Sequence, residues 1–96
     1  MSNHMVTQQT SLDSVFSALA DPTRRRIVER LVRRQFTVNE IASGFAMSRP
    51  AVSKHLRVLE ECGILTREVV GREHRCAIDP KAMRTAATWL ERQERY

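Results

Sequence analysis

Three side chains that could contact nucleic acid recur at intervals of four residues in one stretch of the chain. Arg49, Ser53 and Arg57 would lie on one face of an α-helix, with Pro50 and Lys54 beside them. Arginine, lysine and serine donate hydrogen bonds to base edges and phosphates in a DNA major groove. The stretch therefore predicts a helix that reads duplex DNA. A solvated basic face on an ordinary amphipathic helix is the alternative.

The charges along this helix are ordered. Arg49 and Lys54 lie towards its start, whereas Glu60 and Glu61 lie at its end. The helix dipole places partial positive charge at the N-terminus and adds to this order. A polyanion would therefore approach the N-terminal half, which is the half that contacts bases in recognition helices.

The surrounding sequence predicts a helix, a tight turn and a second helix between residues 37 and 63. Thr37 and Glu40 fit a capping box, and residues 44–47 should form the turn. Ser48 is a good N-cap and Gly63 a good C′ residue for the second helix, which should span about residues 48–62. The apolar positions expected to face the core recur at helical spacing in both helices: Val38, Ile41, Ala42, Phe45, Val52, Leu56 and Leu59.

A β-hairpin, or wing, should follow over about residues 64–78. Gly71 and Arg72 lie between two segments of alternating pattern, and glycine at the first central position is typical of a type II′ turn. Arg72 is then left at the tip. The register pairs Leu65 with Ile78, Arg67 with Cys76, Val69 with His74, and Glu68 with Arg75. Leu65, Cys76 and Ile78 should face the core, and Glu68 and Arg75 should form a charge pair on the other face.

Two helices should precede this unit and one should follow it. The first spans about residues 11–20, and Asp21 and Pro22 start the second, which should run to about Arg34. The second helix should turn Ile27, Val28, Leu31 and Val32 inward. Its arginines should form a solvated surface or contribute weakly to the field that steers DNA: Arg25, Arg26, Arg30, Arg33 and Arg34.

The last helix should span about residues 80–95, starting at Asp79 and Pro80. Its apolar stripe is too wide for the rest of so small a chain to cover, which predicts a partner helix from a second copy of the chain. Together with the first helix, this stripe gives the expected dimer interface: Leu12, Phe16, Ala82, Met83, Ala86, Trp89 and Leu90.

Length and composition narrow the class of protein. The chain has 96 residues, enough for one domain, which we place at residues 11–96 after a disordered arm at residues 1–10. Its net charge of +5 points to a polyanionic partner. No apolar run is long enough for a membrane span and no signal peptide is apparent, so we expect a cytoplasmic protein.

Several single residues have two interpretations. Cys62 and Cys76 should be buried small hydrophobes, with a thiol-based sensor as the alternative. His55 should be half-buried and bonded to the backbone, or else contact a phosphate. His74 could contact a phosphate or lie on a plain surface. Ser53 and His55 point to different sides of a helix, and no catalytic motif is present, so we expect no enzyme and no cofactor.

The predicted order of elements, together with three stretches, resembles the ArsR-type (arsenical-resistance repressor-like) family of winged helix-turn-helix regulators. The stretches are residues 19–31 (LADPTRRRIVERL), 47–65 (MSRPAVSKHLRVLEECGIL) and the wing at 69–75 (VVGREHR). The resemblance implies a mainly α-helical fold of five helices with a β-hairpin wing. It also implies a homodimer that binds a palindromic operator and represses transcription until a signal arrives.

Residue types and resemblance together predict the DNA contacts: Ser48, Arg49, Pro50, Ser53, Lys54, His55, Arg57, Arg72 and His74. Arg49 stands where many relatives carry glutamine, so the resemblance predicts the mode of binding rather than the base sequence. Family members that sense metals carry Cys-x-Cys where this chain has residues 38–41, or an Asp-x-His site where it has Asp79-Pro80-Lys81. The chain therefore fits a branch that binds no metal.

The function predicted is that of a DNA-binding transcriptional regulator, a repressor acting as a homodimer. The alternative is a winged helix used as a protein-interaction module, with its basic face towards an acidic protein.

Overall fold

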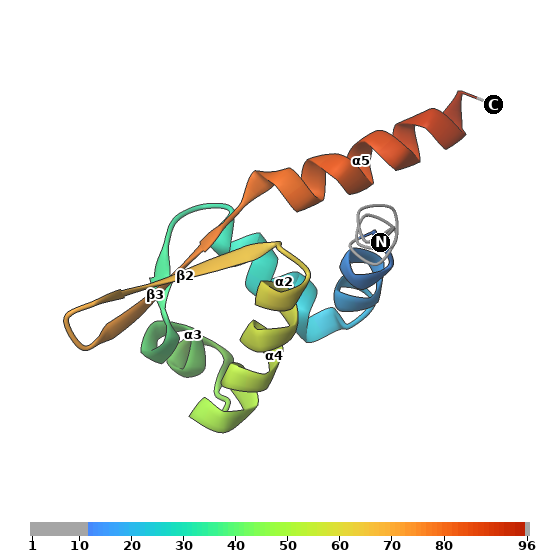
Figure 1. Cartoon of the computed structure of the whole chain (residues 1–96). Coiled ribbons are helices and arrows are strands. Elements are labelled where there is room, and N and C mark those ends of the chain that lie inside the picture. Colours follow the sequence, from blue (N-terminus) through green and yellow to red (C-terminus); the bar gives the residue numbers. More distant parts are fainter. Residues whose placement is uncertain (1–11, 96) are drawn as a thin grey trace, which may run out of the picture.

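The fold is seen in a computed structural model that describes residues 12–95 (Figure 1). The predicted N-terminal arm lies outside the described residues. A first helix covers residues 12–19 and is followed by α2 (Pro22–Leu31), α3 (Val38–Phe45), α4 (Arg49–Glu61) and α5 (Pro80–Glu94). Three short strands complete the domain: β1 (Phe36–Thr37), β2 (Leu65–Val70) and β3 (Glu73–Ile78). The described residues thus form a winged helix-turn-helix with five helices, as predicted.

Helix α2 starts where the sequence predicts but ends earlier. Asp21 caps it by accepting a hydrogen bond of 2.9 Å from Arg24 N. The helix ends at Leu31, three residues before the predicted end at Arg34. Val32, which we expected to face inward, is 62% exposed. At 100° per residue it lies about 90° from the middle of the stripe formed by Ile27, Val28 and Leu31, which explains the error.

Helix α3 begins with the predicted capping box. Thr37 N donates to Glu40 Oε1 over 2.9 Å, and Glu40 N donates to Thr37 Oγ1 over 3.1 Å. The predicted turn at residues 44–47 is partly wrong, because Gly44 still belongs to the helix and the left-handed residue is Ala46, with φ of 52°. A Cβ on Gly44 would lie 2.5 Å from Arg30 Nη1, but that atom is the end of a flexible, exposed side chain that can move aside.

Helix α4 is fixed at both ends. Ser48 Oγ accepts a hydrogen bond of 3.3 Å from Ala51 N at the start. At the end, Gly63 N donates to Glu60 O and Ile64 N donates to Leu59 O, which is the Schellman pattern. Gly63 has φ of 86°, so the chain can reverse directly into β2.

The hairpin has the predicted register. Leu65 lies opposite Ile78, Arg67 opposite Cys76, and Val69 opposite His74. The sequence did not predict β1, which pairs with the other edge of β3 through Phe36 and Cys76 and gives the strand order β1-β3-β2. A strand of two residues is too short to show a period of two, which is why the pattern missed it.

The predicted charge pair between Glu68 and Arg75 is wrong. The two residues are cross-strand neighbours, but the Arg75 guanidinium donates to Glu73 Oε1 at 3.3 and 3.4 Å. Glu73 lies two residues away on the same strand and therefore projects from the same face of the sheet as Arg75.

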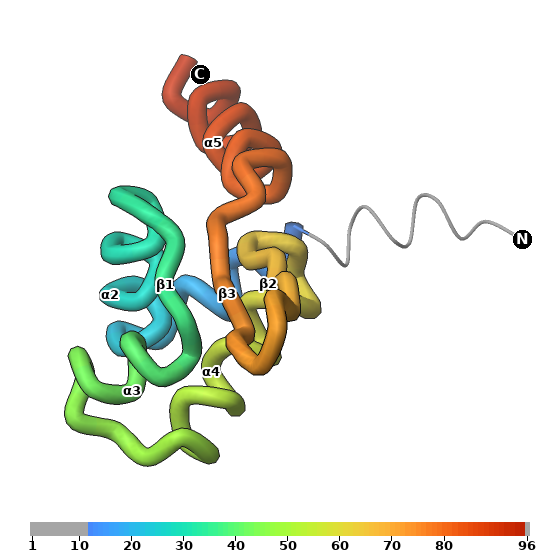
Figure 2. Tube along the Cα trace, turned by 90° about the vertical axis from the view of Figure 1, so that its left-hand side faces the viewer, coloured from blue at the N-terminus to red at the C-terminus, as the bar shows by residue number. Residues whose placement is uncertain are grey.

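The core lies between the first helix, α2, α3, α4 and the base of the hairpin. Its largest fully buried side chains include Ile27, Ile41, Leu56, Leu59 and Ile64. Helix α5 runs along one side of this body, next to the first helix, and buries only Ala86 (Figure 1). Figure 2 shows α5 extending beyond α2 and the hairpin. None of the helices within residues 12–95 is both long and apolar enough to cross a membrane.

The left-handed conformation at Gly63 generates a stability prediction. Gly63→Ala should lower the free energy of unfolding by about 1–2 kcal/mol, because an L side chain resists positive φ. The nearest atom to the new Cβ would be Ala82 Cβ at an ordinary 3.7 Å, so the cost should come from the backbone alone. Gly63→Asn should cost less, since asparagine tolerates this conformation. Urea denaturation measures both, and a Gly63→Ala variant as stable as the wild type would contradict the assignment.

Candidate nucleic-acid interface

The outward face of α4 carries the residues that sequence analysis singled out. Arg49, Pro50, Lys54 and Arg57 are exposed, and Ser53 is half-buried. The opposite face holds Val52, Leu56 and Leu59, all of which are 0% exposed. Because that apolar stripe fixes the rotation of the helix, the basic residues must point to solvent.

The wing brings a second basic element to the same end of the molecule. Arg72 and His74 are exposed at and beside the turn between β2 and β3. In both views the start of α4 and the turn of the wing lie away from α5 (Figures 1 and 2). A helix that enters a groove and a hairpin tip that reaches the flanking backbone could therefore approach one duplex together.

His55 has partners that the sequence did not predict. Its ring is partly buried, but its Nδ1 lies 3.3 Å from Arg24 Nη1 and 3.9 Å from Asp21 Oδ2, not against the backbone. These contacts join α4 to the start of α2. His55 is thus held against the body of the protein, unlike Arg49 or Lys54.

Asp21 is the charged centre of that junction. The hydrogen bond from Arg24 N lowers the pKa of the Asp21 carboxyl, against an opposing effect of partial desolvation, and the Arg24 and His55 side chains lower it further. The Arg24 guanidinium also donates to Ala18 O over 2.8 Å at the end of the first helix. One arginine, absent from our sequence-based candidates, therefore connects the first helix, α2 and α4.

The arginines of α2 are not simply a solvated surface. Arg25 Nη1 donates to Leu19 O and Ala20 O over 2.7 and 3.1 Å, satisfying carbonyls at the end of the first helix. The Arg30 guanidinium lies 4.7 Å above the Phe45 ring. Arg34, just after the helix, lies 3.8 Å above the Phe36 ring. Three of the five predicted surface arginines thus make specific contacts, which hydropathy patterns do not encode.

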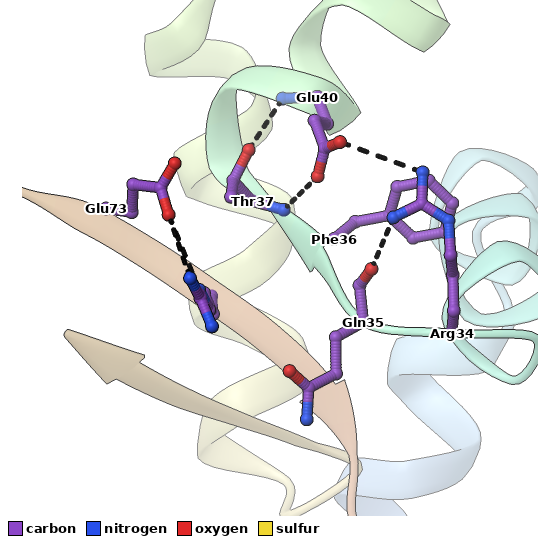
Figure 3. Close-up of a pocket in the computed structure, with 7 residues that line it drawn as sticks. Arg34, Gln35, Phe36, Thr37, Glu40 and Glu73 are labelled. Carbon is purple, nitrogen blue, oxygen red and sulfur yellow. Dashed lines mark hydrogen bonds and ion pairs between the residues drawn. The ribbon is translucent and has the colours of Figure 1, made fainter. Parts of the chain in front are cut away.

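A polar hollow of about 370 Å³ lies beside β1 and the start of α3 (Figure 3). Arg34 Nη2 pairs with Glu40 Oε2 at 3.7 Å, and Arg75 pairs with Glu73 on the opposite wall. Each carboxylate already has a guanidinium partner. The hollow therefore presents neutralised pairs instead of converging ligands of one charge.

Both cysteines are buried free thiols. Cys62 Sγ donates to Leu59 O over 3.3 Å. Burial raises the pKa of the Cys76 thiol, outweighing the lowering effect of the nearby Arg67 charge. A raised pKa disfavours the reactive thiolate that sensing would require. Within residues 12–95, no group of three His, Cys, Asp or Glu side chains is placed to hold a metal ion.

Comparison with known proteins agrees with this geometry. The family model described as "Helix-turn-helix domain" matches residues 19–68. The HTH-type transcriptional regulator Rv2034 of Mycobacterium tuberculosis is 40% identical over 82 residues, which are 85% of this chain and 77% of that protein. Transcriptional repressor SdpR of Bacillus subtilis is 28% identical over 79 residues, covering 82% and 88% of the two chains.

A solved structure extends the likeness to the whole fold. The crystal structure of the ArsR family transcriptional regulator RHA00566 superimposes with a TM-score of 0.84 at 38% identity, covering 91% of this chain and 90% of that one. The chain belongs to the ArsR family of transcriptional regulators. As an ArsR-family member it is a DNA-binding regulator of transcription, and the sequence-based identification is confirmed.

A charged link between α4 and the wing of this ArsR-family protein was not predicted from the sequence. Arg67 Nη2 donates to Glu60 Oε1 over 2.7 Å. The signal was present in the predicted register, which put Arg67 on the face of the hairpin that carries Leu65 and Ile78. An arginine on a core face requires an acidic partner, and Glu60 lies at the near end of the preceding helix.

The junction around Asp21 predicts a pH effect on stability. Because its pKa is lower in the folded than in the unfolded chain, Asp21 stabilises the fold above its ordinary pKa of 3.8. This stabilisation is lost as the pH falls through the lower, folded-state value. Asp21→Asn, which can still cap α2, should therefore lose less stability than the wild type between about pH 5 and pH 2. Urea denaturation of both proteins across this pH range tests the difference. Unfolding free energies that fall in parallel with pH for the wild type and Asp21→Asn would contradict it.

Proposed function

We propose that this ArsR-family protein is a repressor that binds a palindromic operator as a homodimer. The observation that carries the proposal is the two-sided character of α4, with Arg49, Lys54 and Arg57 exposed opposite a fully buried stripe. Repression is the activity named for the relative SdpR. We place the protein in the cytoplasm, where a bacterial regulator meets its DNA.

The proposed contacts divide into two classes. Arg49 and Ser53 would meet base edges in the major groove, beside Pro50 and the N-cap Ser48. Lys54 and Arg57 on α4, and Arg72 and His74 on the wing, would meet phosphates, which position the protein without reading sequence. The partly buried His55 would mainly orient α4 against α2.

The C-terminal part of the α5 stripe supports the second copy, whereas Ala86 is buried in its own chain and Ala82 and Met83 pack against the core. Trp89 packs edge to face on Phe16 at 5.8 Å between ring centroids, yet it remains 43% exposed, and Leu90 is 49% exposed. Beside Trp89 a hollow of about 600 Å³ is lined by Leu12 and residues of α5. A second chain related by a two-fold axis would cover these apolar atoms and supply the second recognition helix for a palindrome.

The competing proposal is a protein-interaction module for an acidic partner. DNA binding is favoured because two of the three exposed cations of α4, Arg49 and Lys54, lie in its N-terminal half, and Arg72 lies at the wing tip, so that a polyanion could meet both elements. A titration of binding to a random-sequence duplex against salt concentration tests this directly. Contact with several phosphates predicts a steep linear fall of log K with log salt, by about 0.9 per neutralised phosphate. A flat salt dependence, or no binding to duplex DNA, would contradict DNA binding.

The recognition face generates a prediction about base readout. Arg49→Ala should weaken binding to a duplex selected from a random library by about 1–3 kcal/mol if Arg49 makes a bidentate base contact. It should also reduce discrimination between that duplex and unrelated DNA. Arg26→Ala, which removes an exposed arginine of α2, is the control for lost charge. Unchanged discrimination in Arg49→Ala, measured by fluorescence anisotropy, would show that the recognition face is misassigned.

The α5 stripe generates a prediction about assembly. Trp89→Ala should weaken dimer association by about 2 kcal/mol, as expected for a central aromatic anchor, and should weaken operator binding with it. Trp89→Phe should lose less, because it retains an aromatic contact with Phe16. Sedimentation equilibrium measures the association. A wild-type protein that is monomeric at tens of micromolar concentration, yet binds a palindrome tightly, would contradict the proposed dimer.

A further inference from the structure

The ion pair between Glu60 and Arg67 is placed where the packed part of the wing ends. The Arg67 side chain is 22% exposed and that of Glu60 33% exposed. Arg67 lies directly opposite Cys76, which is 0% exposed, and on the same face of β2 as the buried Leu65. Arg67 Nε is buried without a hydrogen-bond partner among the described residues. The pair is therefore a charged contact inside an otherwise apolar seam between α4 and β2.

Stability alone does not account for such a pair. Taking two charges partly out of water costs free energy that can exceed their attraction, and an apolar pair of similar size often serves a fold equally well. The unpartnered Nε adds to that cost. The planar guanidinium group of an arginine does, however, fix the orientation of its hydrogen bonds, because its N–H donors lie in one plane.

Apart from the ion pair, the outer wing is supported only along one edge, where β1 pairs with β3 at Phe36–Cys76 and Thr37–Arg75 among the described residues. Beyond Arg67 on β2, Glu68, Val69 and Val70 lie outside the core, and on β3 every residue before Cys76 is exposed. The direct backbone link from α4 to β2 is the short turn around Gly63. The direction in which the hairpin leaves the body is thus set at its base, by Leu65 and Cys76, by the pairing of β3 with β1, and on the β2 side by the ion pair to the last turn of α4.

We propose that Glu60 and Arg67 are positioning residues that hold the wing at the angle to α4 at which Arg72 and the recognition face reach the same duplex. This inference rests on the proposed DNA binding. Glu60 points away from DNA in this account and acts only through Arg67 and the hairpin. Loss of the pair would leave α4 seated by Val52, Leu56 and Leu59 and would loosen the wing on its β2 side, so that its tip could move relative to α4.

A thermodynamic cycle separates positioning from a merely structural role. The dissociation constant for a duplex selected from a random library is measured for the wild type, Glu60→Gln, Arg72→Ala and the double variant. We expect Arg72→Ala to raise the dissociation constant of the wild type about tenfold. In the Glu60→Gln background the same substitution should raise it by less than about threefold, because the wing of that variant no longer brings Arg72 to the DNA backbone. Arg49→Ala in the Glu60→Gln background is the control and should retain its full effect.

The salt dependence of DNA binding provides a second measurement, which can be compared between variants even if their folding stabilities differ. Glu60→Gln alone should reduce the slope of log K against log salt by about one, as Arg72→Ala does, because one phosphate contact is lost in each. Additive effects of Glu60→Gln and Arg72→Ala, with an unchanged slope in Glu60→Gln, would overturn the positioning role while leaving DNA binding intact. A wild-type protein that does not bind duplex DNA would instead overturn the proposed function, and the positioning role with it.

Discussion

The burial of one side of α4 is the constraint on which the rest of the structure depends. Val52, Leu56 and Leu59 are completely enclosed by the core. Truncating a buried leucine typically costs about 2–5 kcal/mol, a large part of the total stability of a small domain. The helix therefore cannot rotate without losing the core, and the same three residues that stabilise the fold determine which side chains can meet DNA.

The parts around α4 share one apolar core, and local hydrogen bonds and arginine contacts add to it. A chain of 96 residues encloses a modest apolar core. Arg25 satisfies the open carbonyls of the first helix, Arg24 connects that helix to Asp21 and His55, and Arg30 lies over Phe45. These contacts orient the helices that present α4. The positive charge of the chain is thus partly structural and not wholly available to a polyanion.

The elements that follow from local rules were predictable. Capping residues gave the starts of α2, α3, α4 and α5, and Gly71 within two alternating segments gave the register of the hairpin. The exposure of Arg49, Lys54 and Arg57 followed from helical spacing. The features that the sequence did not predict join residues that are distant in sequence. Strand β1 is recognisable only by its pairing with β3, and the contacts of Arg24 and His55 join α2 to α4. The Glu60–Arg67 ion pair depends on the path of the turn at Gly63.

The helix ends were a separate source of error. Gly44 looked like the turn residue, yet it lies within α3, and Ala46 adopts the left-handed conformation instead. Val32 looked apolar and inward, but the helix ends before it. Such choices depend on what lies nearby in three dimensions, which a single sequence does not report.

The central claim is that two copies of α4, related by two-fold symmetry, read one duplex. Hydroxyl-radical footprinting of a duplex selected from a random library tests it most directly. The account predicts two symmetric blocks of protection whose centres lie about one helical turn apart, near 34 Å, or a multiple of that distance. A single block without two-fold symmetry would contradict it.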